Sequence, residues 1–343
     1  MSISRWYEST GRNPEIVLSS KVIMTRNLKG YNFPQTMELS DKDEVVKKVE
    51  DALSDKGMSS YRMEGISDKD RSNLIDSQVM SGTSLFSDPE GKAILTNDSR
   101  SLSVVVNDQD HIKIRAQLPG YTNYVYKMCE DLAVDLENKL DVAFSEKYGY
   151  LGSSVVSTGL GFKLMFTIAI PGIVRTGDGL EILQSKVRAH DWKIYPFFND
   201  DKVLKGDVYV VASSASMGHD EISVLDSAAK LMEEIMMIEN LCRDNLRKNR
   251  NDLLENSFYR AYGILYYSKS VDPLEALDLI SWIRLYHGYE DRNEIGIEWD
   301  QINTITSKLL WSIYPMRIKG SKGYNADSKY TAAMIARVIR NRK

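Results

Sequence analysis

The histidines and cysteines are the residue types best suited to metal binding or nucleophilic chemistry, and their spacing argues against both roles. Cys129 and Cys242 lie among apolar or helix-forming residues, so we expect packing residues and not a disulfide or a nucleophile. The histidines are isolated, and none has a second histidine three or four residues away: His111, His190, His219 and His287. The sequence therefore predicts no metal site built from protein ligands.

The composition predicts a globular chain with its own hydrophobic core. With 343 residues, 43% of them hydrophobic, the chain has room for one large domain or two moderate ones. Its net charge of -4 gives no electrostatic reason to expect nucleic acid. The N-terminus lacks the apolar run of a secretory signal, and no segment approaches the length of a membrane span, so we expect a cytoplasmic protein.

The first half of the chain alternates between strand and helix patterns. Residues 40–54 have apolar positions at helical spacing behind Ser40, which we take as the N-cap. Residues 54–90 are rich in Ser, Asp and Gly, which indicates small elements joined by loops. An apolar stripe over residues 124–144 predicts a helix packed on a sheet. Four segments have strand-like patterns: 102–106, 112–115, 164–170 and 207–213.

The second half is helical. A long helix over residues 221–246 should end in the polar run 247–252, where we place a domain boundary. Asp272-Pro273-Leu274-Glu275 is typical of a helix start, and two further helices follow, one with Ile302, Ile305, Leu309 and Ile313 on one face and one from about Asp327. We expect an α/β (α+β) domain with a largely antiparallel sheet over residues 1–250, and a small all-α domain over 251–343.

Several motifs resemble those of the bacterial protein-arginine kinases, the McsB branch of the ATP:guanido phosphotransferases. Trp6, IVLSSKVIMTRNL at residues 16–28 and Phe33-Pro34 resemble the opening signature of that branch, with matched spacing. VNDQDHIKI at residues 106–114 is similar to the family's Asn-Glu-Glu-Asp-His-x-Arg motif. The resemblance implies a guanido-kinase fold.

The resemblance continues to the C-terminal end. GYL at residues 149–151 and GLGFK at 159–163 are similar to a glycine-rich block of the family. McsB proteins also have a C-terminal domain that creatine and arginine kinases lack. That domain is matched at three places: 262–265, 275–276 and 283–285.

The family transfers a phosphoryl group from ATP to a guanidinium, and the resemblance places its catalytic base at Gln109. An amide cannot accept the guanidine proton, and loss of a general base typically costs about 10²- to 10⁴-fold in rate. We therefore expect no catalytic residue here. Of the neighbours Asp108, Asp110 and His111, the last two have an alternative role, which is hydrogen bonding within the sheet.

The phosphate-binding arginines of the family are also replaced. Four of their positions correspond to Lys21, Ile23, Lys113 and Lys163. Lysine is a point donor and cannot reproduce the planar bidentate grip of a guanidinium, while isoleucine has neither charge nor donor. The surviving lysines have the alternative role of solvated surface residues. The fifth arginine falls in residues 192–200, where Lys193, or nothing, takes its place and Asp200 is the candidate for a second family glutamate.

Two further family sites are altered. The Arg-Asp-x-x-Arg motif that reads phosphoarginine in the family aligns with Asp327, Ser328, Lys329, Tyr330 and Thr331, so this pocket lacks its arginine forks. The reactive Cys-Pro-Thr stretch of the superfamily is replaced by residues 154–156. Several changes that converge on one pocket favour a retained fold with an emptied site.

We therefore predict a degenerate pseudokinase that acts through protein contacts. The resemblance implies a true arginine kinase, an adaptor or a Clp-type protease system as the partner, and a homodimer formed by the C-terminal domain. We expect that domain to have more apolar surface than its own core needs, through Leu277, Ile280, Trp282, Ile283, Leu309, Trp311 and Ile313. For the two tryptophans, packing against the α/β domain is the alternative.

Two other functions remain open at this point. One is an active ATP-dependent phosphotransferase, in which Lys21, Lys113 and Lys163 hold the phosphates and Asp108 or Asp200 replaces the base. The other is a sensor that binds nucleotide without turnover. We expect no cofactor, and ATP with Mg²⁺ only if activity remains.

Overall fold

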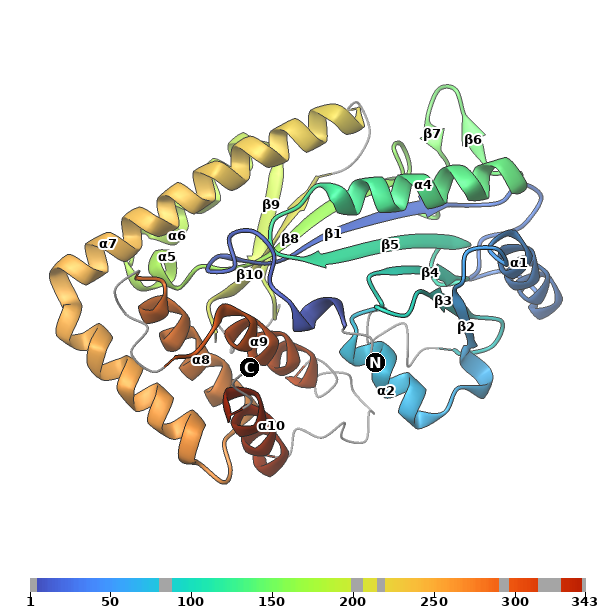
Figure 1. Ribbon diagram of the computed structural model, residues 1–343. Helices are drawn as coiled ribbons and strands as arrows, with labels where there is room; N and C mark the ends of the chain where they lie inside the picture. Colours follow the sequence, from blue (N-terminus) through green and yellow to red (C-terminus); the bar gives the residue numbers. More distant parts are fainter. Residues whose placement is uncertain are drawn as a thin grey trace.

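The computed structural model describes residues 5–79, 88–198, 206–214, 220–289, 296–313 and 328–340. Within them lies an eight-stranded, fully antiparallel sheet of order β2-β3-β4-β5-β1-β8-β10-β9 (Figure 1). The strands are β1 (Val17–Arg26), β2 (Ser59–Arg62), β3 (Ala93–Thr96), β4 (Leu102–Val106), β5 (Ile112–Pro119), β8 (Phe162–Ala169), β9 (Trp192–Pro196) and β10 (Val208–Ser213). A separate hairpin pairs β6 (Phe144–Ser145) with β7 (Gly149–Tyr150). The expected antiparallel sheet is confirmed.

Helices pack on both faces of the sheet. They are α1 (Leu39–Ala52), α2 (Asp68–Asp76), α4 (Tyr124–Lys139), α5 (Pro171–Arg175), α6 (Gly179–Ala189), α7 (Glu221–Tyr267), α8 (Pro273–His287), α9 (Trp299–Ile313) and α10 (Ser328–Arg340). Short 3-10 turns form η1 (Trp6–Glu8), η2 (Met63–Gly65) and η3 (Val155–Ser157). In Figure 1, α4 and the first part of α7 lie in front of the sheet. Their apolar stripes bury one sheet face in the first hydrophobic core.

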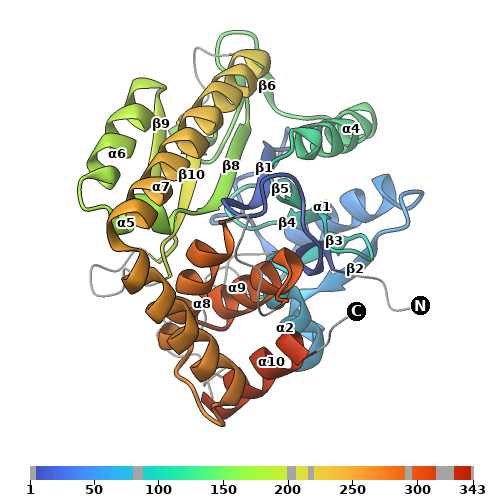
Figure 2. The same cartoon turned by 60° about the vertical axis from the view of Figure 1, so that its left-hand side comes forward.

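A second hydrophobic core lies on the opposite face of the sheet and draws on both halves of the chain. It contains Ile94, Val105, Ala169 and Val208 from the strands and Phe258, Leu277, Ile305 and Ile335 from the C-terminal helices. Figure 2 shows α2 beside α9 and α10, far from it in sequence, and α2 contacts α9. Residues 1–250 and 251–343 therefore share a core, and their independence as folding units remains a prediction.

Two helix boundaries differ from the sequence prediction. The helix from Glu221 does not end in the polar run but continues to Tyr267, with one non-helical residue, Arg250, inside it. The chain bends there while the apolar side chains on both sides of the bend stay buried. The N-cap of α1 is Glu38, not Ser40, and it makes no side-chain cap. The predicted cap at Asp272 is confirmed, because its carboxylate accepts the N–H of Leu274.

The apolar side chains proposed for self-association are buried within the chain. Leu277, Ile280, Ile283 and Leu309 are fully buried in the second core. The Trp311 ring meets the Phe197 ring edge-on at 5.9 Å, and the guanidinium of Arg175 lies 3.8 Å above the Trp282 ring. Both tryptophans thus pack against the α/β part of the chain. The side chain of Ile313 lies outside the described residues.

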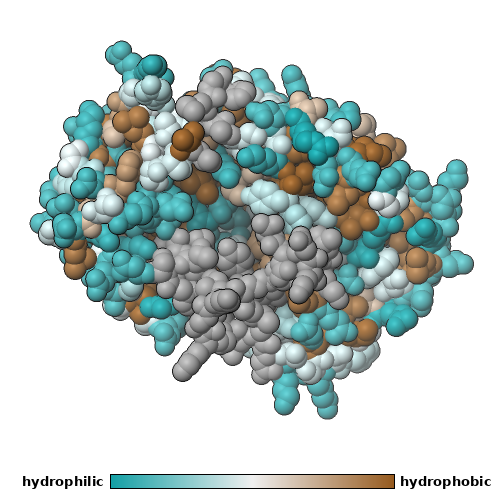
Figure 3. All heavy atoms as spheres, turned by 180° about the vertical axis from the view of Figure 1, so that it is seen from behind, coloured by the Kyte–Doolittle hydropathy of each residue, from teal (hydrophilic) through white to brown (hydrophobic). Residues whose placement is uncertain are grey.

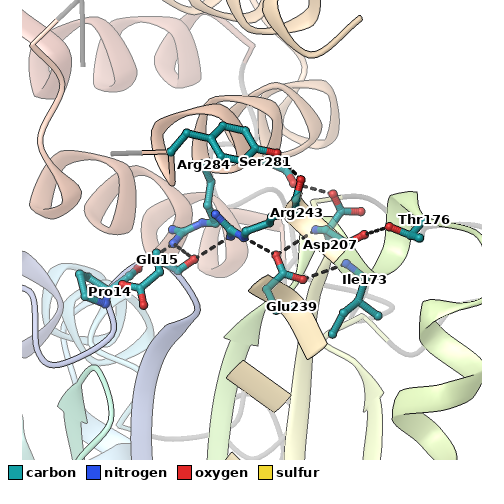
Figure 4. Close-up of polar contacts among 11 residues, drawn as sticks. Pro14, Glu15, Ile173, Thr176, Asp207, Glu239, Arg243, Ser281 and Arg284 are labelled. Atoms are coloured by element: carbon teal, nitrogen blue, oxygen red, sulfur yellow. Dashed lines mark hydrogen bonds and ion pairs between the residues drawn. The ribbon is translucent and has the colours of Figure 1, made fainter. Parts of the chain in front are cut away.

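A buried ionic network joins α5 and α7 (Figure 4). Glu239 of α7 accepts hydrogen bonds from the backbone N–H groups of Gly172 and Ile173, at 2.9 and 2.8 Å, at the start of α5. The same carboxylate binds Nε of Arg243 at 2.7 Å. Arg243 also donates to the backbone oxygen of Glu15 at 3.2 Å. A buried carboxylate and a buried guanidinium thus satisfy one another, as burial of charge requires.

The network extends to α8 and fixes the C-terminal helices on the sheet. Arg284 donates to the backbone oxygen of Pro14 at 2.9 Å and to Oδ1 of Asn303 at 2.5 Å. Burial and the nearby charge of Arg243 lower the pKa of Arg284 to about 9. Ser281, also on α8, donates to the buried carboxylate of Asp207 at 2.5 Å (Figure 4). Polar contacts therefore help to fix the position of α8 on the sheet.

Candidate functional site

The strand register gathers the predicted phosphate-binding positions on one face of the sheet. Ile23 lies directly between Arg115 of β5 and Lys163 of β8. Opposite residues of antiparallel strands point to the same face. The register across β5, β1, β8, β10 and β9 puts six residues on the same face of the sheet: Lys21, Ile23, Lys113, Arg115, Lys163 and Lys193. We call the surface formed by these six residues the cation face.

The cation face is the one that α4 and α7 leave uncovered. Those helices stand in front of the sheet in Figure 1, and the molecule seen from behind has a hollow near its centre (Figure 3). Described atoms on the walls of this hollow include many of hydrophilic residues. Four lysines and one arginine on one face of the sheet form a candidate anion site.

Lys113 is already bound by its own chain. Its Nζ lies 2.9 Å from Oδ2 of Asp108 and 3.4 Å from Oε1 of Gln109. Gln109, at the family's base position, is exposed in the turn between β4 and β5, and its backbone oxygen accepts from Nε2 of Gln35 at 2.8 Å. The ammonium at a phosphate-binding position is therefore neutralised by the carboxylate five residues before it.

Lys21 and Lys163 are half-buried without a compensating carboxylate among the described residues. Burial lowers the pKa of Lys21 well below its usual value, and the charges of Arg115 and Lys163 lower it further. Burial also lowers the pKa of Lys163, with a contribution from Lys193. In the described part of the chain, neither ammonium has a hydrogen-bond or ion-pair partner. These two side chains hold the least stable positive charges of the face.

Arg115 is the residue of this face that the sequence analysis missed. It is buried, and its two terminal nitrogens donate to the backbone oxygens of Val79 and Gln78, the latter at 2.6 Å. Gln117 donates to Oε1 of Gln78 at 2.8 Å. Burial lowers the pKa of Arg115 to about 10. No pattern marks Arg115 in the sequence, because its partners lie more than 30 residues earlier.

Asp110 and His111 are integrated into the fold. Asp110 accepts from Nδ2 of Asn27 at 2.9 Å and from the N–H of Ser153 at 2.7 Å. Nδ1 of His111 accepts the N–H of Leu28 at 2.9 Å, so the proton on Nε2 is donated to a backbone oxygen, that of Asn32. Burial lowers the pKa of His111, which keeps the ring neutral. Hydrogen bonding within the fold accounts for both residues.

Other residues of the family-like motifs also have structural contacts. Nε1 of Trp6 donates to the backbone oxygen of Ser77 at 3.0 Å. The guanidinium of Arg26 lies 3.4 Å above the Tyr150 ring and binds a carboxylate of α4. Gly161 has φ +55°, and a Cβ there would come within 2.7 Å of the Thr25 backbone oxygen. These contacts give each of the three residues a structural role in the fold.

The remaining predicted site residues do not join the centre of the face. Lys193 lies on β9 and is exposed. Ser328 and Tyr330 begin α10, where Tyr330 is exposed and has no guanidinium beside it among the contacts of the described chain. Asp200 and Asp327 lie outside the described residues. The 154–156 segment forms η3, beside the hairpin of β6 and β7.

A cavity of about 80 Å³ lies near the start of α7, lined by Phe162, His190, Trp192, Ser213, Ser223 and Ser227 among others, and it contains none of the predicted site residues. No group of three or more His, Cys, Asp or Glu side chains is placed to hold a metal ion in the described ranges.

No described helix has the length and apolar character needed to cross a membrane. Cys129 is buried, which raises its pKa to about 12.

Comparison with solved structures shows the fold. Lombricine kinase superposes with a TM-score of 0.57 and 16% identity over 66% of this chain and 68% of that one. The duplicated taurocyamine kinase from Schistosoma mansoni gives a TM-score of 0.57 and 20% identity over 67% of this chain. The match covers 33% of the length of the duplicated enzyme.

Comparison with known sequences is more specific. The protein-arginine kinase of Pelotomaculum thermopropionicum is 27% identical over 90% of this chain and 85% of that protein. The protein-arginine kinase of Brevibacillus brevis is 25% identical over 99% of this chain and 95% of that protein. Residues 42–242 match the ATP:guanido phosphotransferase C-terminal catalytic domain, which covers more than half of the chain. The chain therefore belongs to the ATP:guanido phosphotransferase family and resembles its McsB-type protein-arginine kinases along nearly its whole length.

Proposed function

We propose that the chain is a McsB-type pseudokinase that acts in the cytoplasm through contact with another protein and does not transfer phosphate. The observation that carries this proposal is the arrangement of Lys113, Asp108 and Gln109. The residue at the base position is an amide, and its oxygen accepts a hydrogen bond from the lysine at a phosphate-binding position. In this proposal, the family's base position and one of its phosphate-binding positions bind each other through an internal hydrogen bond.

The nearest carboxylate does not restore the base. Asp108 is bound to the Lys113 ammonium at 2.9 Å, and a carboxylate held by a cation is a poor proton acceptor. Asp110 uses one oxygen to accept from both Asn27 and Ser153. Neither side chain is arranged to take a proton from a guanidinium substrate.

The phosphate clamp is weakened at three of its positions. Lys113 is paired, Ile23 offers no donor, and Lys21 has a lowered pKa that disfavours its charge. The guanidinium on the face, Arg115, is committed to two backbone oxygens. A triphosphate would therefore meet few free donors, and no cofactor is required for the proposed role.

The test is a search for phosphoarginine. The full chain is incubated with ATP, Mg²⁺ and an arginine-rich protein, with the protein-arginine kinase of Listeria welshimeri as the positive control, and both samples are analysed by mass spectrometry. We expect no phosphoarginine above the level without enzyme. Clear turnover by the chain would overturn the proposal.

The second candidate is an active phosphotransferase that uses ATP and Mg²⁺ with lysines in place of arginines. It is favoured by Lys21 and Lys163, whose ammonium groups have no partner among the described residues and which lie on the same face of the sheet. If the chain shows turnover, Lys163→Ala should abolish it. Turnover that survives this change would exclude the lysine-based mechanism.

A protein partner is the remaining part of the proposal. Tyr267 at the end of α7 and Tyr330 on α10 are 75% and 54% exposed, and exposed tyrosines suit protein contacts. We propose a homodimer or a complex with an arginine kinase, an adaptor or a Clp-type protease system. Light scattering on the full chain, with Tyr267→Ser as the variant, tests self-association, and a monomer at micromolar concentration would exclude the homodimer.

A further inference from the structure

The amine of Lys21 has an environment that differs from that of an ordinary surface lysine. It is half-buried in the middle of β1, with Gln117 opposite on β5 and Met165 opposite on β8. Neither neighbour is an acid. Within the described residues its Nζ has no hydrogen bond and no ion pair, and its charged neighbours are Arg115 and Lys163.

The other charges on this face do not compensate Lys21. Lys193 of β9 extends the row of cations beyond Lys163 and lowers the pKa of Lys163. Asp108 is the described carboxylate that acts on Arg115, and it is bound to Lys113. Lys21 is therefore flanked by cations on both neighbouring strands.

An amine in such a place is chemically distinctive. A desolvated lysine beside other cations holds its proton weakly, and the neutral amine is a nucleophile toward carbonyl carbon. The same neighbouring cations attract anions, so a carbonyl compound with a negative charge would be concentrated beside the amine. We propose that Lys21 is a reactive amine that forms an imine with small anionic carbonyl compounds on the cation face.

The reaction needs no oxidant or cofactor. The lone pair of Nζ attacks the carbonyl carbon, a C–N bond forms, and the carbonyl oxygen leaves as water after taking the two amine protons. The product is an imine, which cyanoborohydride reduces by hydride transfer to a stable secondary amine. The positive charge of Lys163 has two effects. It disfavours the protonated form of the Lys21 amine, and it attracts the anionic carbonyl compound.

The test uses glyoxylate as the anionic carbonyl probe and glycolaldehyde as an uncharged one. The full chain is treated with each probe and cyanoborohydride at neutral pH, and labelling rates are measured peptide by peptide by mass spectrometry. The reference is Lys47, an exposed lysine on α1. Burial and the charges of Arg115 and Lys163 lower the pKa of Lys21, so more of its amine is neutral and we expect glyoxylate to label Lys21 at least about tenfold faster than Lys47. The preference should be smaller with glycolaldehyde.

Two variants separate reactivity from chance exposure. Lys163→Gln removes one flanking charge and should slow glyoxylate labelling of Lys21 severalfold, with its unfolding curve checked to confirm the fold. Lys186→Gln changes an exposed lysine on α6 that pairs with Glu234, and should leave the rate unchanged. The proposal is wrong if Lys21 is labelled no faster than Lys47, or if Lys163→Gln has no effect on its rate.

Discussion

Arg115 donates from a terminal nitrogen to the backbone oxygen of Gln78 at 2.6 Å, so a guanidinium of the cation face holds the chain that follows α2. The residue before Gln78 is held as well, because the backbone oxygen of Ser77 accepts a hydrogen bond from the indole N–H of Trp6. The 3-10 turn that contains Trp6 contacts α9. One arginine thus links the middle of the sheet to the C-terminal helices.

Replacing Arg115 should loosen this link. In Arg115→Met the backbone oxygens of Gln78 and Val79 lose their donor, which costs about 1–3 kcal/mol for a buried polar group left unpaired. We expect a lower free energy of unfolding in urea and faster hydrogen exchange over residues 74–79. Arg188→Met, on the exposed side of α6, should change stability by less than about 0.5 kcal/mol. Unchanged exchange over residues 74–79 would contradict the assigned role.

Nucleotide should stabilise the chain very little. Lys113 is paired with Asp108, and the pKa of Lys21 is lowered, so the phosphates meet few available charges. If the dissociation constant exceeds 1 mM (order of magnitude), that concentration of ATP adds less than about 0.4 kcal/mol, or about 1 °C. Differential scanning fluorimetry with and without MgATP measures this. A shift of several degrees would show a working nucleotide site.

Glu239 should be essential for stability. In Glu239→Ala the buried guanidinium of Arg243 loses its counter-charge and two N–H groups of α5 lose their acceptor. Removing one partner of a buried pair costs about 3–5 kcal/mol. The double variant Glu239→Ala with Arg243→Met should be less destabilised than the sum of the two single changes. Additive losses in urea unfolding would show that the two charges do not interact.

Stability should fall as the solution becomes acidic. Burial lowers the pKa of His111 below its ordinary 6.5, whereas the unfolded chain takes up the proton normally. The contribution of this ring is therefore complete above about pH 6.5 and is lost as the pH falls below that value. His287 has a lowered pKa for the same main reason, its burial. Urea unfolding between pH 7.5 and 5 should show a shallower pH dependence in His111→Gln, and an identical slope would be evidence against this assignment.

Truncation after Arg250 should not leave a stable domain. The second core would lose Phe258, Leu277, Ile305 and their neighbours, and Ala169 and Val208 on the sheet would be uncovered. Each fully buried side chain of this kind contributes about 1.5–3 kcal/mol. We expect residues 1–250 alone to aggregate or to unfold without a cooperative transition in circular dichroism. A sharp transition close to that of the full chain would support two independent domains.

The sequence alone determined the local features of the fold. Alternating apolar residues predicted β5 and β8, and short apolar runs predicted β4 and β10, because both patterns depend only on neighbouring positions. The start of α8 followed from Asp272 and Pro273, whose effects act within one turn. Family motifs identified Gln109, Lys113 and Lys163 by position. In contrast, β1, β2, β3 and β9 were not predicted as strands, and β2 and β3, with four residues each, are too short for a clear pattern.

Only the tertiary structure decided what the site residues contact. Residues 21, 113, 115 and 163 meet because three strands pair in one register, and no local pattern specifies that register. The commitment of Arg115 to Gln78 and the burial of Trp311 against Phe197 join positions 37 and 114 residues apart. The same holds for Glu239, which reads as one more acid in a polar helix until α5 places two N–H groups against it. The residues next to a charged or aromatic side chain in the sequence do not show which residue it will contact. That partner is determined by how elements far apart in the sequence pack together.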